Sequence, residues 1–422
     1  MLTKMSTKKL RSMLDDVLSE ISPSEALRKE VLGKVRVFLE SINARLKKLK
    51  ISARACLGGS YAKDTWLLGD YDVDVFVLFG KKHAHESLSD LLAKALEPWN
   101  PERLHGSRDY FQIKNGIEKG IAYEFVPVLD IKKSSDAKNT TDFSPLHVAW
   151  VTAKGKKLKN DIRLFKKFCK ANQVYGAESY IRGVSGHVAD LLIIEYDGFL
   201  NALKAIKKWK PKVILDSRNV YEGKAMLIMN ASKTEGPLII VDPVQPERNA
   251  ASAFSQEKCD LLIKASQKFM KKPSRAFFEE QHLDWKRLQQ KKCLVKFSCV
   301  PLDGKPDVVG TKMLKVFEYV REQLAEFGVQ HAGWEWKETS PATMWFVLKH
   351  AKISDTVVVQ GPPLSMKEHV LHFKQKHKHT FVKGKKILAN VSREHARAEL
   401  LAQHLLSSGF VQERVKSCRL EN

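Results

Sequence analysis

Residues 56–79 read CLGGSYAKDTWLLGDYDVDVFVLF, a pattern that predicts a strand, a glycine turn, a short helix, a second turn and another strand. The second strand carries Asp72 and Asp74, separated only by Val73. Because side chains alternate along a strand, the two carboxylates point to one face, and the valines between and after them point into a core on the other face.

Two aspartates on one face of a sheet repel each other, and a divalent cation relieves that repulsion. Mg²⁺ binds one or two protein carboxylates together with substrate phosphates. Upstream, Gly58, Gly59 and Ser60 stand where the first strand ends, and exposed N–H groups at such a turn can hold a phosphate. Each motif alone is more often structural, but their combination at this spacing favours transfer of a nucleotidyl group.

A third acid lies in the apolar segment IAYEFVPVLDIK. Residues 110–113 and 121–129 are predicted strands, joined across Asn115-Gly116. Glu124 sits within the second of them, where a charged residue must be paired, bind a metal or lie on an exposed face. If this strand pairs beside the Asp72 strand, Glu124 becomes a third carboxylate, sufficient for two metal ions.

Composition describes a soluble globular protein with an affinity for polyanions. The 422 residues are 43% hydrophobic and 28% charged, with a net charge of +24 spread along the chain. Nucleic acid is the favoured partner; a basic proteome background or an acidic membrane surface is the alternative.

No apolar run is long enough to span a membrane, and the N-terminus lacks the apolar block of a signal peptide, so we expect a cytoplasmic protein. The six cysteines have no CxxC spacing and are expected to be reduced thiols.

The central segment is predicted to be mostly helical. A helix over 159–172 should turn Ile162, Phe165, Phe168 and Cys169 inward. The same pattern predicts that its basic residues point largely outward; these are Arg163, Lys166, Lys167 and Lys170. Further on, Arg248 follows a short buried strand and can reach a ligand from a loop.

The C-terminal region has a βαββαβ order that suggests a ferredoxin-like unit, with residues 365–376 as its second helix and 380–388 as its last strand. Residues 367–386 interleave lysine with histidine and phenylalanine, which is typical of a surface that binds phosphates. Zinc binding is disfavoured because no cysteine lies near its histidines, which are His369, His372, His377 and His379.

Four segments carry a resemblance to a known family. GGSYAKDTWLLGDYDVDVFVLF resembles the nucleotidyltransferase signature of the polymerase β superfamily, and SYAKDTWL in particular resembles the archaeal, class I CCA-adding enzymes, which are tRNA nucleotidyltransferases. Further similarity lies in SPLHVAW, in RLFKKFCKANQVYGAESYIRGVSGHVADLL and in VDPVQPERNAA.

The resemblance implies a role for each matching residue. Asp72, Asp74 and Glu124 would hold Mg²⁺. The implied nucleotide contacts are Ser60 and Lys63 beside Gly59, then His147, Lys166 and Tyr175 on the triphosphate, and Arg248 on the Watson–Crick edge of the base. Two residues depart from the family, since Glu124 stands where Asp is usual and Lys63 where Arg is common.

We therefore expect a multidomain α+β protein. Its parts would be a polymerase β-like nucleotidyltransferase head over 1–140, a mostly helical nucleotide-recognition domain over 141–270 and a ferredoxin-like, tRNA-binding C-terminal region over 271–422. The implied reaction is template-independent addition of C, C and A to tRNA from CTP and ATP, by a two-metal mechanism. The alternatives are a poly(A) polymerase, another terminal transferase such as a nucleotidylating toxin, and an inactive RNA-binding protein. The sequence is compatible with a homodimer.

Overall fold

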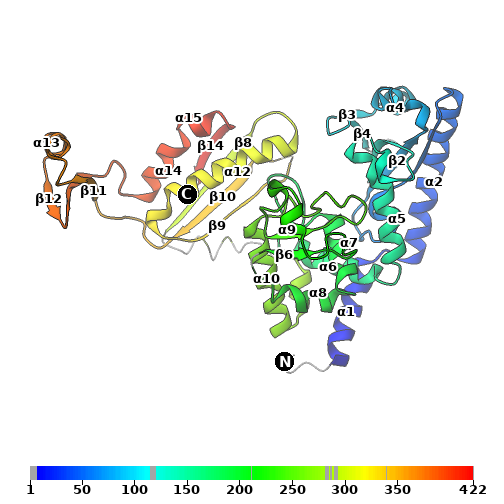
Figure 1. The fold of residues 1–422 in the computed structure, drawn as a ribbon, viewed down its shortest axis with the longest axis horizontal. Coiled ribbons are helices and arrows are strands. Elements are labelled where there is room, and N and C mark those ends of the chain that lie inside the picture. Colours follow the sequence, from blue (N-terminus) through cyan, green and yellow to red (C-terminus); the bar gives the residue numbers. More distant parts are fainter. Residues whose placement is uncertain are drawn as a thin grey trace. The chain divides into compact units, whose positions relative to one another are not determined.

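The computed structural model describes residues 7–114, 120–210, 212–280, 285, 288, 293–338 and 340–421. The predicted Asn115-Gly116 turn lies outside these residues. The chain forms two compact units, Met1–Gln281 and His282–Asn422, which are described separately below (Figure 1).

The first unit contains a mixed five-stranded sheet in the order β1-β2-β5-β4-β3. Its central pair, β2 and β5, is parallel, and the other neighbouring strands are antiparallel. The strands are β1 (Ala53–Leu57), β2 (Asp72–Phe79), β3 (Glu102–Leu104), β4 (Tyr110–Lys114) and β5 (Ala122–Leu129).

One face of this sheet is covered by the helices α2 (Glu25–Lys48) and α4 (Leu88–Leu96). Figure 1 shows α2 running beside the sheet, and its apolar stripe is buried against the alternate valines of β2. The opposite face of β2 carries first Asp72 and Asp74 and then Phe76 and Leu78, which form a small cluster with β5. The predicted alternation is confirmed, and it leaves the acids off the main core.

A second core of the same unit lies among helices and a short parallel pair of strands. The helix α1 (Thr7–Ile21) packs into this core. The other elements are α5 (Ser144–Lys154), α6 (Lys159–Ala171), α7 (Gly186–Glu195), α8 (Phe199–Ile206), β6 (Val213–Leu215), α9 (Ala225–Ile228), β7 (Leu238–Ile240) and α10 (Gln256–Lys271). The division at residues 140 and 270 stays a prediction.

The second unit contains an antiparallel four-stranded sheet in the order β14-β8-β10-β9. Its elements are β8 (Leu294–Pro301), α12 (Pro306–Gln323), β9 (Val329–Glu335), β10 (Ala342–Leu348), α14 (Ala398–Leu406), α15 (Gly409–Gln412) and β14 (Val415–Glu421). The connectivity and strand order are those of a ferredoxin-like fold, as predicted, and in Figure 1 α12 lies across the sheet.

The prediction for the second half of that fold is wrong. Its helix and last strand are α14 and β14, whereas residues 365–376 contain a different helix and residues 380–388 lie in a separate three-stranded sheet. That sheet, β11-β13-β12, consists of β11 (Thr356–Pro363), β12 (Thr380–Lys383) and β13 (Lys386–Ser392), with α13 (Lys367–Lys376) beside β11. Local patterns identify strands but not which strand returns to pair with β8, so the sequence could not separate the two sheets.

The cysteine prediction is wrong for one pair. Cys299 and Cys418 are register partners on β8 and β14, with Cα atoms 4.2 Å apart, and they form a disulfide. They lie 119 residues apart in sequence, and only the antiparallel pairing of the two strands brings them together. The other four cysteines are free thiols.

Candidate active site

Three carboxylates gather on one face of the central strand pair. Asp74 on β2 is the register partner of Glu124 on β5, and Asp72 lies two residues earlier on the same face of β2. Register partners on parallel strands point to the same side, so the three acids face common space. Gln112 on β4 donates to Glu124 Oε2 at 3.3 Å.

Burial and mutual repulsion both act on these acids. Burial raises the pKa of Asp74 above its ordinary value, and the charge of Asp72 raises it further. Burial likewise raises the pKa of Glu124, with the charge of Asp74 as the next cause. A site that disfavours its own negative charges in this way favours a bound cation.

The glycine turn is fitted to Asp74. The backbone N–H of Gly58 donates to the carbonyl oxygen of Asp74 at 2.8 Å. Gly59 opens the short helix α3 (Gly59–Lys63) with a φ of +49°, and a Cβ placed there would lie 1.6 Å from Asp74 Oδ2. Only glycine fits this position, for both conformation and space. Ser60, half-buried, follows directly.

A buried carboxylate joins two of the predicted phosphate-binding lysines. Lys63 Nζ lies 2.5 Å from Asp190 Oδ2, and Lys166 Nζ lies 3.8 Å from Asp190 Oδ1. Lys166 also donates to Thr65 Oγ1 at 3.1 Å. Both lysines lie close enough to act electrostatically on Asp74.

The ionisation of this trio reflects a balance of burial and charge. Burial lowers the pKa of Lys166 to about 8, with Asp190 opposing and Lys63 reinforcing the shift. Burial alone would raise the pKa of Asp190, but the two lysine charges outweigh it and hold that pKa below its ordinary value. The carboxylate therefore stabilises two buried ammonium groups at once.

The prediction that the basic residues of α6 point outward is wrong for two of them. Lys166 is buried as just described, and the buried Arg163 donates to the backbone oxygens of Trp66 and Asp64 at 3.2 and 2.7 Å. This face of α6 packs against the segment after α3, because guanidinium and ammonium donors there satisfy carbonyl groups that would otherwise be orphaned. The inward residues Ile162, Phe165, Phe168 and Cys169 are buried as predicted.

His147 and Arg248 meet on a second buried carboxylate, Asp242, which follows β7. His147 Nε2 lies 2.8 Å from Asp242 Oδ1, and Arg248 Nη1 donates to Asp242 Oδ2 at 3.1 Å. The His187 Nε2 atom lies 3.6 Å from the same Oδ2. His187 and Asp190 are three residues apart on α7, so one helix face serves both carboxylate clusters.

Tyr175 lies at the edge of this arrangement. Its backbone forms a bridge with Val184, and the Lys170 ammonium lies 5.4 Å from its ring centroid. A Cβ on Gly186 would lie 3.1 Å from the Tyr175 hydroxyl oxygen, so that hydroxyl points to the start of α7. Burial raises the pKa of Tyr175, which keeps its hydroxyl protonated as a donor.

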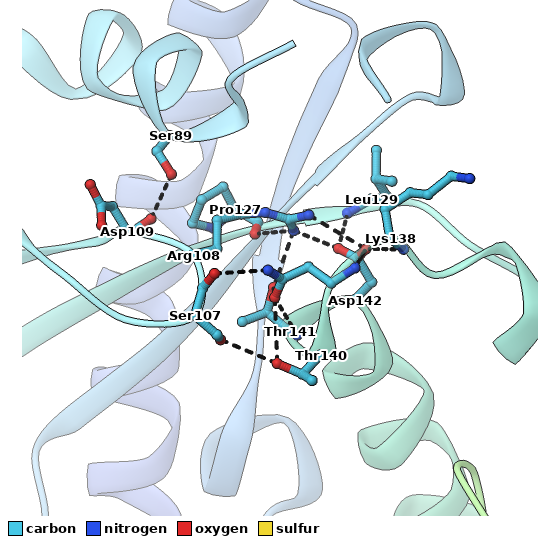
Figure 2. A network of polar contacts seen from close by, with 11 residues as sticks. Ser89, Ser107, Arg108, Asp109, Pro127, Leu129, Lys138, Thr140, Thr141 and Asp142 are labelled. Carbon is cyan, nitrogen blue, oxygen red and sulfur yellow. Dashed lines mark hydrogen bonds and ion pairs between the residues drawn. The ribbon is translucent and has the colours of Figure 1, made fainter. Parts of the chain in front are cut away.

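A polar network fixes the connection from β5, the strand of Glu124, to α5, the helix of His147 (Figure 2). The fully buried Asp142 pairs with Arg108 and accepts from the backbone N–H groups of Leu129, Lys138 and Asn139 at 2.9 to 3.0 Å. Arg108 also donates to the carbonyl oxygen of Pro127 at 2.9 Å, on β5 itself. The end of β5 and the start of α5 are thereby held as one piece.

Sequence reasoning did not single out four of these residues, which are Gln112, His187, Asp190 and Asp242. Asp190 and Asp242 carried a usable signal, because each is an acid inside an apolar run, VADLLII and LIIVDP. The histidines of α13 and its flanks form no metal cluster; among the described residues, the groups with metal-ligand spacing are His147, His187 and Asp242, and Glu394, His395 and His404.

Three family models match successive parts of the chain. They describe a nucleotidyltransferase domain over residues 39–147, the second domain of tRNA nucleotidyltransferase over 160–279 and the C-terminal domain of CCA-adding enzyme over 291–415. A solved structure of the RNA terminal uridylyl transferase Cid1 is similar with a TM-score of 0.51 at 15% identity, over 66% of this chain and 99% of that one. At this identity, the likeness concerns the fold.

Several curated relatives are CCA-adding enzymes of archaea. The one from Nanoarchaeum equitans is 40% identical over 240 residues, which is 56% of this chain and 60% of that protein. The one from Methanococcus maripaludis is 27% identical over 413 residues, 94% of this chain and 92% of that protein. The one from Archaeoglobus fulgidus is 29% identical over 332 residues, which is 76% of this chain and 70% of that protein.

The head fold, with its acids on one sheet face beside a glycine turn, defines a nucleotidyltransferase of the polymerase β type. The matched domains and the archaeal relatives then narrow this class. The chain belongs to the CCA-adding enzymes, a family of tRNA nucleotidyltransferases, which confirms the resemblance drawn from its motifs. Within the described residues, no helix is both long and apolar enough to cross a membrane.

Proposed function

We propose that this enzyme adds C, C and A to the 3′ end of tRNA from CTP and ATP, with Asp72, Asp74 and Glu124 as its metal-binding catalytic residues. One observation carries the proposal: the register of β2 against β5 aligns Asp74 with Glu124, and Gly59 brings the turn before Ser60 against the Asp74 carboxylate. Metal ligands and a triphosphate-binding turn are thus adjacent.

The three acids fit Mg²⁺. Their oxygens are hard ligands, and burial raises the pKa values of Asp74 and Glu124, which shows that the site disfavours its negative charges when no cation is bound. Bound there, Mg²⁺ would acidify the RNA 3′ hydroxyl and neutralise charge on the triphosphate. Glu124 is longer than the Asp usual in the family, and Gln112 orients its carboxylate by donating to Oε2 at 3.3 Å.

The chain's own cations would hold the triphosphate. Lys63 and Lys166 share the single charge of Asp190, so the trio keeps a net positive charge for an incoming phosphate. His147, Ser60 and the protonated hydroxyl of Tyr175 would add hydrogen-bond donors. Lys63 stands where Arg is common in the family, and its compact ammonium fits the buried contact with Asp190.

Arg248 is suited to reading the base. Its side chain is 45% exposed, and one of its nitrogens is anchored on Asp242. A guanidinium has five N–H donors in a rigid fork, so an anchored arginine can still present donors to a base edge.

The second unit would bind the body of the tRNA. The helix α13 ends in Lys374 and Lys376, and the following segment continues with Lys378 and, at the end of β12, Lys383. Exposed lysines of this kind neutralise phosphates and release counter-ions. We also propose that the enzyme acts in the cytoplasm and forms a homodimer. Mass photometry of the purified chain tests the homodimer.

The direct test supplies the purified protein with tRNA that lacks its last three nucleotides, labelled CTP or ATP, and Mg²⁺. Ordered addition of two C and one A is the expected result, and the Asp74→Asn variant prepared in parallel controls for contaminating enzymes. A long A tail would instead indicate a poly(A) polymerase, a U tail from UTP would indicate a uridylyl transferase, and binding of RNA without incorporation would indicate an inactive module.

A further inference from the structure

Asp242 has an unusual number of partners for one carboxylate. It is fully buried after β7, and its contacts come from α5, from α7 and from its own loop. Oδ1 accepts from His147 at 2.8 Å and from the backbone N–H groups of Val244 and Gln245 at 2.9 and 3.1 Å, while Oδ2 accepts from Arg248 at 3.1 Å.

These contacts describe a hydrogen-bonded anion more closely than a metal ligand. Oδ1 already accepts three hydrogen bonds, and a cation at Oδ2 would have to displace the guanidinium of Arg248. Burial alone would raise the pKa of Asp242, but the hydrogen bond from His147 and the nearby imidazole of His187 outweigh it and hold that pKa well below its ordinary range. The carboxylate is therefore ionised and needs its cationic and imidazole partners.

We propose that Asp242 is a positioning residue that couples the two ends of the nucleotide site, so that a change at the base-reading arginine alters the grip on the triphosphate. This inference rests on the proposed function, in which Arg248 meets the base and His147 meets the triphosphate. Both side chains depend on the same anion, one on each of its oxygens.

The coupling follows from charge. While Arg248 stays on Oδ2, its charge compensates the buried anion that holds His147 through Oδ1. A base that draws Arg248 away leaves an uncompensated negative charge beside His147, and that charge repels a triphosphate. Coupling between two sites is reciprocal. A nucleotide whose base contacts Arg248 without breaking the Arg248–Asp242 ion pair should therefore bind more tightly through both its base and its triphosphate.

The decisive experiment measures a ligand that has no base. Binding of inorganic triphosphate, in the presence of Ca²⁺ and without tRNA, is followed by calorimetry for the full chain and for Arg248→Ala. The matched control is Lys233→Ala, since Lys233 donates to the backbone oxygen of Glu247, next to Arg248 in the loop. Both variants remove one positive charge from the same neighbourhood, but only Arg248 contacts Asp242.

We expect Arg248→Ala to weaken triphosphate binding by ~10-fold, within the usual range for coupled sites, and Lys233→Ala to weaken it by less than about twofold because of ionic screening. In an Asp242→Asn background, where the anion is gone, Arg248→Ala should have no larger effect than Lys233→Ala. Equal effects of the two variants in the native background would overturn the proposal, and this comparison stands even if Asp242→Asn fails to fold.

The calorimetry needs no catalysis, so the two proposals fail separately. If the native chain adds no nucleotide to trimmed tRNA, the proposed function is wrong whatever the binding data show. If it adds C, C and A while Arg248→Ala and Lys233→Ala bind triphosphate alike, the reaction stands and the coupling through Asp242 is wrong. Arg248→Lys provides a rescue: it keeps a cation on Oδ2 and should restore part of the triphosphate affinity.

Discussion

Asp74 and Glu124 are register partners on the adjacent parallel strands β2 and β5, and burial raises the pKa of each, with the charge of a neighbouring acid adding to the shift. The folded protein therefore holds protons on these acids more tightly than the unfolded chain does. Its stability without metal should fall as the pH rises from the ordinary carboxyl range, near 4, through the raised pKa values.

Replacement of Asp74 by Asn removes one of these repelling charges. We expect the metal-free protein at neutral pH to unfold at a higher temperature than the native chain, and the stabilisation by added Mg²⁺ to shrink. Incorporation of CTP should drop by at least about 100-fold, since even the outer partners of metal ligands contribute 10–100-fold. Thermal unfolding in EDTA and in Mg²⁺ measures the first effect; an unchanged Mg²⁺ response would contradict the assignment of Asp74.

Gly59 and Gly69 form a matched pair for testing the turn, because both have a positive φ but only Gly59 lies against Asp74. An alanine Cβ at 59 would displace the Asp74 carboxylate, and misplacement by 1 Å can cost about 100-fold in rate. At 69 the added Cβ meets open space, so Gly69→Ala should cost roughly 1–2 kcal/mol of backbone strain without loss of turnover. Initial rates and urea unfolding curves of both variants separate the two effects.

Lys166 makes nucleotide binding dependent on pH. Burial lowers the pKa of Lys166 to about 8, so its ammonium loses its proton within the accessible range. The affinity for CTP should fall as the pH rises through that value, approaching about tenfold per pH unit if the charge is essential. Arginine stays charged at these pH values, so Lys166→Arg should bind CTP with a flatter pH profile. The same slope in both proteins would point to another titrating group.

Replacing Asp142 tests how much the polar network of Figure 2 contributes to the stability of the fold. Asp142→Ala leaves the half-buried Arg108 without its carboxylate partner, and breaking such a pair costs about 3–5 kcal/mol. Asp136→Ala breaks an ion pair with the exposed Lys81, worth at most about 1 kcal/mol. Burial alone would raise the pKa of Asp142, but Arg108 and the backbone donors outweigh it and lower that pKa. The native chain should therefore lose stability as the pH falls below about 4, and Asp142→Ala should show a weaker acid dependence in denaturant titrations.

The lysines of α13 test the tRNA-binding surface. Lys374 and Lys376 lie in the last turn of α13, as Lys47 and Lys48 lie in the last turn of α2, and all four are exposed. Replacing the first pair by alanine should weaken tRNA binding and reduce the slope of log affinity against log salt by roughly 0.7–0.9 for each phosphate that is no longer neutralised. Replacing Lys47 and Lys48 by alanine is the control, because it also removes two charges from the end of a helix. Filter binding at several salt concentrations measures the tRNA affinity of both double variants. If the variant that lacks Lys374 and Lys376 has the same salt slope as the native chain, α13 does not contact the tRNA.

The sequence by itself determined the elements around the strands that carry the three acids. The spacing of Asp72 and Asp74 against the valines of β2 fixed which face carries the acids, because alternation in a strand is a local property. The glycine turn, the apolar stripe of α2 and the position of Arg248 on a loop were equally local, and the four motifs were enough to indicate the family.

Only the tertiary structure decided which distant residues share a partner. Lys63 and Lys166 converge on Asp190, His147 and Arg248 converge on Asp242, and Cys299 pairs with Cys418 because strands and helices from separate parts of the chain pack together. The same packing buries Arg163 and Lys166, which the helical periodicity predicted to point outward. It also makes β14 the last strand of the four-stranded sheet, in place of the predicted residues 380–388. A charged side chain is buried where another segment supplies its counter-charge or acceptor, and periodicity within one segment contains no information about that other segment.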